Sequence, residues 1–442
     1  MGRGIDPGPS AHLRIDAPRS ACYDISAHRK QAGSRLLTVD EQFQAIKRGT
    51  AEIVPEEGLK AKLKKAQQTG KPLRIKLGLD PTAPDIHLGN AVVLRKMRQF
   101  QDFGHEVYII IGDFTTSIGD PSGRSATRPQ LSEDEIKENA RTYYDQYCLI
   151  LDPAKTHVVF NSEWLGKLSF ADVLKIAAKL TVARVIERDD FANRLAEGKP
   201  ISLHELLYPM CQAYDSVVLE SDIEVGALDQ TFNILTGRDL QTQYGQEEQV
   251  ALFMPILVGL DGVQKMSKSL GNYIGITEAP GEMFGKVMSI ADGLMPNYFE
   301  LCTDVPLEEI EEVKNGLSLG KLHPMDVKKR LAREIVTIYH SKEAAREAQA
   351  EFERVFSQHE VPQDMPEVIV GNADLVEGKV WIVKLLVMAG TVASNSEARR
   401  LVQQGAVTLD GKKISDASMN VVVNDGQVLR AGKLKFARMR LG

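Results

Sequence analysis

The hydrophobic pattern divides the chain into stretches of different character. From Leu73 to about Ile274, short apolar runs alternate with amphipathic segments. The run Val107–Gly112 has the length and the β-branched content of a buried parallel strand. Strands that alternate with helical segments predict a doubly wound α/β sheet, in which ligands bind at the carboxyl ends of the strands. The same pattern predicts two amphipathic helices between Thr38 and Gly70, before the first strand.

The segments around this alternation suggest the domain boundaries. Residues 1–37 carry Pro, Gly, Ser and Arg without apolar periodicity and lack the apolar core of a signal peptide, so we expect a disordered extension. The sheet domain is expected at 38–279, with a helical, charged insertion at about 150–207. The remaining expectations are a helical domain at 280–357, a linker with Pro, Gly and acidic residues at 358–377, and a compact α+β module at 378–442.

Composition narrows the class of protein. A chain of 442 residues with 43% hydrophobic and 26% charged residues is large enough for several globular domains. No run approaches the ~18 apolar residues that a membrane helix needs. The four cysteines are scattered and form no C-x-x-C pair, which fits neither a disulfide framework nor a zinc site. We therefore expect no membrane span, no structural metal and a reducing compartment.

The charge is distributed unevenly along the chain. The net charge of −6 is not that of a nucleic-acid-binding protein. Residues 378–442, however, carry 11 Lys/Arg and 4 Asp/Glu, a local charge of +7, which leaves −13 for the rest. A basic terminal module on an acidic body predicts that only this module contacts phosphates.

The stretch Ile75–Asn90, I-K-L-G-L-D-P-T-A-P-D-I-H-L-G-N, carries the first candidate chemistry. It predicts a strand, a turn with two prolines, and a helix that begins near His87, with Asp85 as the expected N-cap. A helix N-terminus after a strand is an anion-binding arrangement, because its unpaired N–H groups point at the ligand. His87 and Asn90 would share one helical face, and Gly89 between them allows a ligand to approach closely.

Two further motifs complete the candidate chemistry. In K-M-S-K-S, Lys265 and Lys268 lie on a glycine-flanked loop after an apolar run and can close over phosphates. In L-L-Y-P-M-C-Q-A-Y-D, the spacings of four and three put Tyr208, Gln212 and Asp215 on one helical face. Burying such groups without partners costs about 1–3 kcal/mol each, so an inward polar face favours a polar ligand.

These motifs together resemble a known family. D-P-T-A-P-D-I-H-L-G-N is similar to the "HIGH" region of class I aminoacyl-tRNA synthetases, and K-M-S-K-S to their second signature. In order and spacing, the chain from about Thr38 to its C-terminus resembles bacterial tyrosyl-tRNA synthetases. The resemblance implies a Rossmann-like catalytic domain, an anticodon-side helical domain, cytoplasmic location, and a homodimer through the insertion. It also implies activation of L-tyrosine with ATP and Mg²⁺, transfer to tRNA(Tyr), and no tightly bound cofactor.

The resemblance also assigns roles to residues of this sequence. Donors that stabilise the reacting phosphate, and so act in catalysis, would be His87, Asn90, Lys265 and Lys268. ATP would be bound by these four together with Asp80, Gly89 and Asp229. Tyrosine would be bound by Asp120, Tyr208, Gln212, Asp215 and Gln230, with Asp215 accepting the hydrogen bond of the phenol. No residue is assigned to a metal.

The basic C-terminal segment T-V-A-S-N-S-E-A-R-R-L-V-Q-Q-G-A-V-T-L-D-G-K-K-I resembles the alpha-L RNA-binding motif. It predicts a helix over Ser394–Gln404, capped by Ser394 or Asn395 and ended by Gly405, and then a hairpin with a D-G turn. The expected tRNA-binding residues are Arg399, Arg400, Lys412 and Lys413.

The sequence departs from the family pattern in three places, which together involve Asn90, Ala227, Leu228 and Lys76. Asn90 stands where many relatives have a second histidine, G-A-L-D-Q (Gly226–Gln230) replaces G-G-(S/T)-D-Q, and Lys76 replaces a tyrosine that touches the phenol in some relatives. The alternatives that stay open are a tryptophan-activating relative, a catalytically impaired RNA-binding protein, and a bare nucleotide-binding module. Each basic or polar motif could also be an ordinary solvated face.

Overall fold

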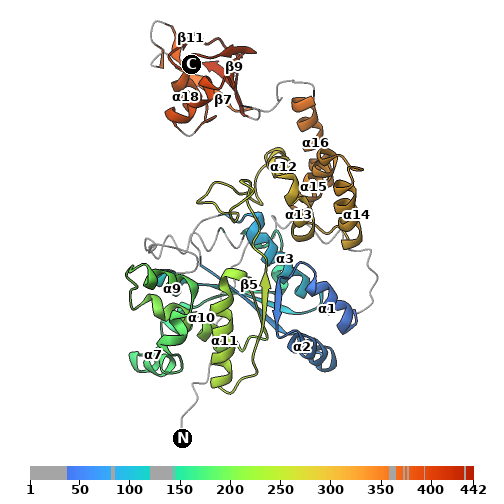
Figure 1. Cartoon of the computed structure of the whole chain (residues 1–442), viewed down its shortest axis with the longest axis vertical. Coiled ribbons are helices and arrows are strands. Elements are labelled where there is room, and N and C mark those ends of the chain that lie inside the picture. Colours follow the sequence, from blue (N-terminus) through green and yellow to red (C-terminus); the bar gives the residue numbers. More distant parts are fainter. Residues whose placement is uncertain are drawn as a thin grey trace. The chain divides into compact units, whose positions relative to one another are not determined.

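The structure, a computed structural model, describes residues 37–80, 85–119, 142, 145–357, 365–371, 374–375, 378–392, 394–432 and 435–442. The expected N-terminal extension therefore lies, apart from residue 37, outside the described residues. The chain forms two units: one extends to Ala279 and includes Lys286–Ser341, and the other holds Pro280–Gly285 and Lys342–Gly442 (Figure 1). Among the described residues, no helix has the length and apolar character to cross a membrane.

The first unit is built on a six-stranded sheet with the strand order β1-β6-β5-β2-β3-β4. Every neighbouring pair is parallel except β1, which runs antiparallel to β6. The chain passes from β2 outward to β4 and then returns to the other side of β2 through β5, so the order reverses between β2 and β5. The strands are β1 (Glu52–Val54), β2 (Arg74–Leu79), β3 (Glu106–Ile111), β4 (Thr156–Phe160), β5 (Ile223–Ala227) and β6 (Val250–Met254). The doubly wound fold is confirmed, with its ligand crevice expected at this reversal.

Helices cover this sheet and bury its central strands. The side chains of Ile75, Ile109 and Phe253 are fully buried, as expected of strands covered on both faces. Figure 1 shows α10 (Tyr208–Leu219) and α11 (Thr231–Gln243) side by side. The other helices of this part are α1 (Val39–Lys47), α2 (Glu56–Thr69), α3 (Leu88–Asp102) and α4 (Asp113–Ile118). Both helices expected before the first parallel strand are present as α1 and α2.

The structure corrects the start of the insertion. Strand β4 lies inside the expected range 150–207, so the helical insertion begins only after Phe160. All five residues of β4, T-H-V-V-F, are partly exposed at the sheet edge, and this explains why no fully apolar run marked the strand. The insertion contains α6 (Ser162–Leu165), α7 (Phe170–Ala177), α8 (Val182–Ile186) and α9 (Asp189–Ala196). The short edge strand β1 was also not predicted.

The region 280–357 is helical, but it does not form a domain of its own. Residues 286–341 belong to the same unit as the sheet. Arg95 of α3 pairs with Asp304 at 2.6 Å, and the Tyr298 hydroxyl donates to the carbonyl of Val258 at 2.6 Å. These contacts are the physical reason why the helices join the sheet unit. The helices of this region are α12 (Pro280–Ser289), α13 (Met295–Cys302), α14 (Leu307–Ser318), α15 (Pro324–Tyr339) and α16 (Lys342–Ser357). Of these, α13, α14 and α15 belong to the sheet unit, whereas α16 and the first six residues of α12 belong to the second unit.

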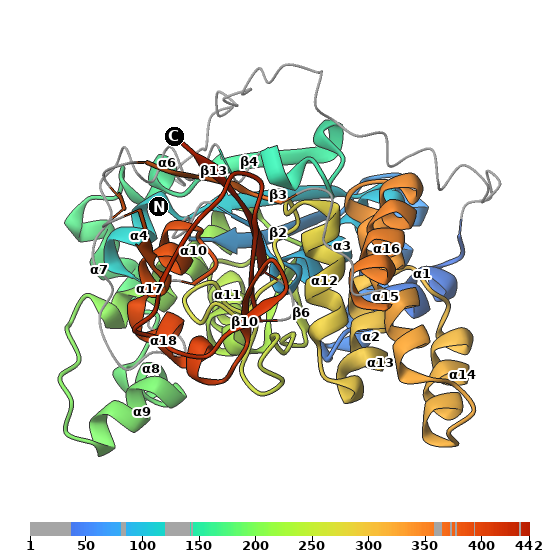
Figure 2. The same cartoon turned by 90° about the horizontal axis from the view of Figure 1, so that it is seen from above.

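The second unit contains a five-stranded sheet with the order β10-β9-β12-β13-β7. Strand β7 (Glu367–Val370) pairs in parallel with β13 (Lys435–Leu441), so part of the expected linker 358–377 belongs to this sheet. The four residues of β7 alternate between exposed and buried, and their partner lies at the far end of the chain, where no local pattern announces it. Figure 2 shows this unit from above, and its other elements are α17 (Ile382–Met388), α18 (Asn395–Gln403), β8 (Val380–Trp381), β9 (Val407–Leu409), β10 (Lys412–Ile414), β11 (Asn420–Val421) and β12 (Val428–Ala431).

Candidate active site

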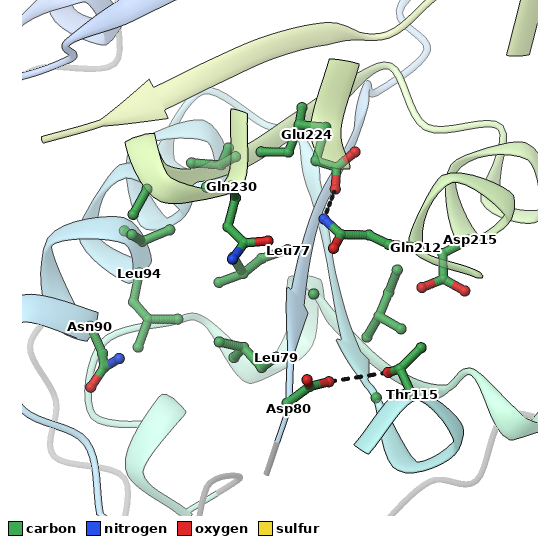
Figure 3. A pocket seen from close by; sticks show the side chains of 18 of the residues that line it. Leu77, Leu79, Asp80, Asn90, Leu94, Thr115, Gln212, Asp215, Glu224 and Gln230 are labelled. Carbon is green, nitrogen blue, oxygen red and sulfur yellow. Dashed lines mark hydrogen bonds between the residues drawn. The ribbon is translucent and has the colours of Figure 1, made fainter. Parts of the chain in front are cut away.

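A cavity of about 310 Å³ lies at the carboxyl ends of β2, β3 and β5, beside the reversal of strand order (Figure 3). The wall comes from the ends of these strands, from the first turn of α3, and from one face of α10. Seven of the predicted site residues line it: Asp80, Gly89, Asn90, Tyr208, Gln212, Asp215 and Gln230. Segments that lie far apart in the sequence are therefore brought to one cavity.

The N-terminus of α3 is capped by His87, which corrects the expectation that Asp85 is the cap. The backbone N–H of Asn90 donates to the imidazole Nδ1 of His87 at 3.4 Å, and the His87 N–H donates to the Asn90 side-chain oxygen at 3.2 Å. The two residues form a reciprocal capping pair, so Asp85 stands outside the helix. A methyl group on Gly89 would lie 3.0 Å from the His87 ring, so the glycine leaves room for this arrangement.

The capping pair defines which atoms of His87 and Asn90 face a ligand. Burial, and then the positive charge of Lys268, lower the pKa of His87 to about 4, so the imidazole is neutral at pH 7. Because Nδ1 accepts a hydrogen bond, the proton of the neutral ring is on Nε2. The Asn90 oxygen is also engaged, so its NH₂ group is the end that remains for a ligand. Both motif residues thus present neutral N–H donors.

The K-M-S-K-S loop meets the H-L-G-N turn. The ammonium group of Lys268 donates to the backbone oxygen of Asp85 and lies 3.8 Å from the Asp85 carboxylate. Next to it, the backbone N–H of Leu88 donates to the carbonyl of Ile274 at 2.9 Å, and Ile276 N–H donates to Ile86 O at 3.0 Å. The H-L-G-N turn is therefore joined to the K-M-S-K-S loop through Lys268, and to the segment that follows the loop by backbone pairing.

The loop lysines stand outside the wall of the cavity. Lys265 and Lys268 are not among the lining residues, and neither are His87 and Asp229. Lys265 pairs with Asp229 at 3.3 Å, so two residues assigned to ATP contact each other directly. Partial burial lowers the pKa of Lys268, against the attraction of Asp85. Asp120 lies outside the described residues.

The polar face of α10 points into the cavity as expected. The Tyr208 hydroxyl donates to one carboxylate oxygen of Asp80 at 3.0 Å, and the Thr115 hydroxyl donates to the other at 3.1 Å. A methyl group on Gly112 would lie 2.2 Å from Asp80, so only glycine fits beside this carboxylate. Asp80, which the family resemblance assigns to ATP binding, is thus hydrogen-bonded to Tyr208, which the resemblance assigns to tyrosine binding.

Asp215 lies deep in the cavity, with only 3% of its surface exposed. The indole N–H of Trp164 donates to one carboxylate oxygen at 2.7 Å, and the amide of Asn161 reaches the other at 3.5 Å. Burial raises the pKa of Asp215 to about 7, while the charge of Lys76 and the two donors oppose this shift. The carboxylate can accept a further hydrogen bond from a ligand.

Sequence reasoning missed several of these residues. Asn161 directly follows the last residue of β4, where ligand-binding side chains of α/β sheets gather, and Trp164 lies in the next short helix. Glu224 is a charged residue inside the apolar strand I-E-V-G-A and lines the cavity. A charge in a buried strand is a signal that could have identified Glu224, because such a group needs a partner.

Comparison with known proteins agrees with this geometry. Residues 67–357 match the model of the family described as tRNA synthetases class I (W and Y), and residues 380–426 match the S4 domain. The tyrosine–tRNA ligase of Moorella thermoacetica is 60% identical, over 91% of this chain and 96% of the relative. That of Aquifex aeolicus is 50% identical, over 92% of this chain and its own full length. The chain belongs to the tyrosine–tRNA ligase family.

A solved structure shares the architecture. The tyrosyl-tRNA synthetase of Archaeoglobus fulgidus, which was crystallised with L-tyrosine, aligns with a TM-score of 0.57 and 26% identity. The alignment covers 71% of this chain and all of that one. Both the fold class and the family expected from the motifs are therefore confirmed.

The residues that depart from the family pattern differ in whether they line the cavity. Ala227 lines the cavity, whereas Leu228 is 41% exposed and is not among the lining residues. A methyl group on Gly226 would lie 2.6 Å from Ile234, so this glycine of the motif is required by packing. Lys76, at the third departure, is fully buried and pairs with Glu224 at 3.0 Å.

The S4 module of this family member presents its basic residues to solvent. The side chain of Ser394 caps α18, Gly405 follows the helix with φ of +66°, and the hairpin turn Asp410–Gly411 has φ of +47° and +74°. The predicted helix, cap and hairpin are thus present. The four predicted tRNA-binding residues, Arg399, Arg400, Lys412 and Lys413, are all exposed, and Arg399 lies over the ring of Trp381 at 5.4 Å.

Proposed function

We propose that this protein is a tyrosine–tRNA ligase, which activates L-tyrosine with ATP and transfers it to tRNA(Tyr). The observation that carries the proposal is Asp215, a buried carboxylate in a cavity whose wall also includes Asn90 of the H-L-G-N turn, the turn that Lys268 contacts through Asp85. An amino acid with a hydrogen-bond donor at the end of its side chain fits this acceptor. The names of the relatives support the same substrate.

The first step forms tyrosyl-adenylate. The carboxylate oxygen of tyrosine attacks the α-phosphorus of ATP, a new O–P bond forms, and the bond to pyrophosphate breaks. No side-chain nucleophile takes part, so catalysis consists of positioning and charge stabilisation. His87 and Asn90 supply neutral N–H donors, and Lys265 and Lys268 supply positive charge at the leaving pyrophosphate.

Tyrosine is bound through both of its ends. Asp215 accepts the phenol O–H, while the side-chain oxygen of Gln212 and the hydroxyl oxygen of Tyr208 receive the α-ammonium group. Gln230, on the opposite wall of the cavity, is the proposed contact of the amino-acid carboxyl group. Asp120 remains a proposed contact of the ammonium group. Phenylalanine would leave the Asp215 carboxylate buried without this partner, which disfavours its binding.

Mg²⁺ accompanies ATP in the proposed reaction and would neutralise phosphate charge. This ion keeps several waters and binds mainly through the phosphates of its nucleotide. Within the part of the chain that the structure describes, no group of three His, Cys, Asp or Glu side chains could form a dedicated site. We propose that the ion is held mainly by the phosphates of the nucleotide.

The tRNA and a second subunit are the proposed macromolecular partners. Arg399, Arg400, Lys412 and Lys413 would contact tRNA phosphates. A homodimer through the insertion is supported by the exposed apolar side chains of Phe170, Leu174, Val182 and Leu195. Sedimentation at micromolar concentration would test the dimer. Cytoplasmic location is part of the proposal, because the tRNA substrate is there.

The deciding experiment is ATP–pyrophosphate exchange with tyrosine, tryptophan or phenylalanine as the amino acid. We expect exchange with tyrosine alone. Exchange with tryptophan would instead identify the protein as a tryptophan-activating relative. Absence of exchange with every amino acid, together with retained tRNA binding, would contradict catalysis and favour an RNA-binding role.

A further inference from the structure

The strongest unassigned feature is a buried ion pair beneath the amino-acid pocket. Lys76 of β2 and Glu224 of β5 are register partners on neighbouring parallel strands. Their charged groups lie 3.0 Å apart, and their side chains are only 1% and 2% exposed. Glu224 lines the cavity, whereas Lys76 lies behind it. Two buried charges cost free energy unless they are paired and hydrogen-bonded, so the arrangement needs a reason.

The carboxylate of Glu224 is held by donors on both oxygens. Oε1 forms the ion pair with the Lys76 ammonium group and receives a hydrogen bond from the side-chain nitrogen of Gln212 at 3.2 Å (Figure 3). Oε2 receives hydrogen bonds from Ser216 and Gln249. These groups come from β2, from α10 and from the residue before β6, so the position of Glu224 is set by the packing of α10 against the sheet.

A glycine makes room for this network. Gly237 lies within α11, and a methyl group there would lie 2.7 Å from the Ser216 hydroxyl and 2.8 Å from the Gln249 nitrogen. Glycine in a helix interior costs up to about 1 kcal/mol relative to alanine, which is tolerated here because the polar groups occupy that space.

The network determines how Gln212 faces a ligand. Because its side-chain nitrogen donates to Glu224, its oxygen is the end directed elsewhere. An ammonium group has only donors and requires such an acceptor. The Lys76 ammonium group also lies 3.4 Å from the backbone oxygen of Gln212, so the pair holds this residue at two points.

The pair also acts on Asp215, one turn further along α10. Lys76 lowers the pKa of Asp215 and Glu224 raises it. Among the described residues, Cys211 is a further titratable group coupled to this carboxyl, and its thiol stays neutral because burial raises its pKa to about 12. Trp164 and Asn161 are the uncharged donors on the remaining side.

We propose that the Lys76–Glu224 pair is a positioning device for tyrosine specificity: Glu224 orients Gln212 toward the ammonium group, and Lys76 holds Glu224 and the backbone of Gln212 in place and supplies the buried positive charge of the pocket that also contains Asp215. The inference rests on the proposed tyrosine activation. In this proposal Lys76 acts on Glu224 and Asp215 and does not contact the substrate.

Two single variants separate this role from a merely structural one. Lys76→Met removes the cation, and Glu224→Gln removes the anion with little change of shape. We expect the inflection in the pH profile of kcat/KM for tyrosine to move upward in the first variant and downward in the second. At pH 7, Lys76→Met should lose about fivefold in kcat/KM for the first unit of this displacement, because half of the carboxyl groups are ionised in the wild-type protein, and about tenfold for each further unit. Pyrophosphate exchange is the assay.

Lys62→Met is the matched control. Lys62 is another buried lysine of this unit, and it pairs with Asp222 at 3.3 Å and Glu247 at 3.0 Å, none of which lines the cavity. Its loss should reduce thermal stability and leave the pH profile in place. If Lys76→Met does not fold, the double variant Lys76→Met with Glu224→Gln takes its place, because it removes both charges and leaves no unpaired charge in the core. The double variant and Glu224→Gln are then compared with the wild-type protein.

Opposite displacements of the two profiles would support the inference. Unchanged profiles, or displacements in the same direction, would overturn the inference. The proposed function would still stand in that case, provided that the wild-type protein shows tyrosine-dependent exchange. Wild-type protein with no preference for tyrosine would overturn both.

Discussion

The amino-acid pocket and the S4 module use charge in opposite ways. In the pocket, Asp215 and Glu224 are buried, and each is held by several donors from different elements. In the module, Arg399, Lys412 and their basic neighbours are exposed. Burial couples charges strongly and changes their pKa, whereas solvent and salt screen exposed charges.

The difference teaches where specificity and affinity come from in this protein. A buried carboxylate discriminates between ligands, because a ligand without a donor leaves the carboxylate buried and unpaired, which costs free energy of binding. Exposed basic residues add small, nearly independent contributions to phosphate binding, and these depend on ionic strength. Single substitutions should therefore have large effects in the pocket and small ones in the module.

Lys268→Ala should have the largest effect. Lys268 meets the H-L-G-N turn through Asp85, and its charge is proposed to stabilise the leaving pyrophosphate. We expect the rate of pyrophosphate exchange to fall by roughly 10²–10³-fold, as when one preorganised donor is removed from a reacting centre. Lys321→Ala, on an exposed segment, is the control and should leave the rate unchanged. An unchanged rate for Lys268→Ala would sink the proposed mechanism.

Asp215→Asn should come next and tests the pocket side of the comparison. The kcat/KM ratio of tyrosine to phenylalanine should fall by roughly 10–100-fold, because the site no longer buries an unpaired carboxylate with phenylalanine. Asp239→Asn, at an exposed position of α11, should keep the wild-type ratio. Retained discrimination in Asp215→Asn would assign the phenol contact to another residue.

Gly237→Ala tests whether the polar network beneath the pocket limits packing. Its methyl group would press on Ser216 and Gln249, so we expect the free energy of unfolding to fall by about 1–3 kcal/mol. Gly285→Ala is the matched helical control: no atom lies within 4 Å of its added methyl group, and it should stabilise by about 0.5–1 kcal/mol. Denaturant unfolding measures both, and equal signs would contradict the steric argument.

Arg399→Ala should have the smallest effect. We expect a few-fold rise in KM for tRNA, a salt dependence of binding that is reduced by about one phosphate contact, and unchanged pyrophosphate exchange. Arg440→Ala is the control in the same module, because its charge is already paired with Glu367 and Asp425. A loss of pyrophosphate exchange in Arg399→Ala would contradict the view that the S4 module acts in tRNA binding and not in tyrosine activation.

Local motifs made much of the site predictable. The capping residue Ser394, the turn Asp410–Gly411 and the polar spacing of α10 each act within a few residues, so their geometry follows from the sequence. The same holds for the turn at His87, although the cap is His87 and not Asp85, because the reciprocal pair with Asn90 satisfies more backbone groups. Edge strands β1, β4 and β7 escaped prediction because they are short and only partly buried.

The sequence by itself determined the family, the doubly wound fold and seven of the residues that line the pocket, since these depend on periodicity and on motifs with fixed spacing. Only the tertiary structure decided which charges meet. Lys76 and Glu224 lie on strands that are distant in the chain and adjacent in the sheet, and Trp164 reaches Asp215 from the insertion. The physical reason is that the register of parallel strands and the packing of helices are set by long-range contacts, which no local pattern encodes.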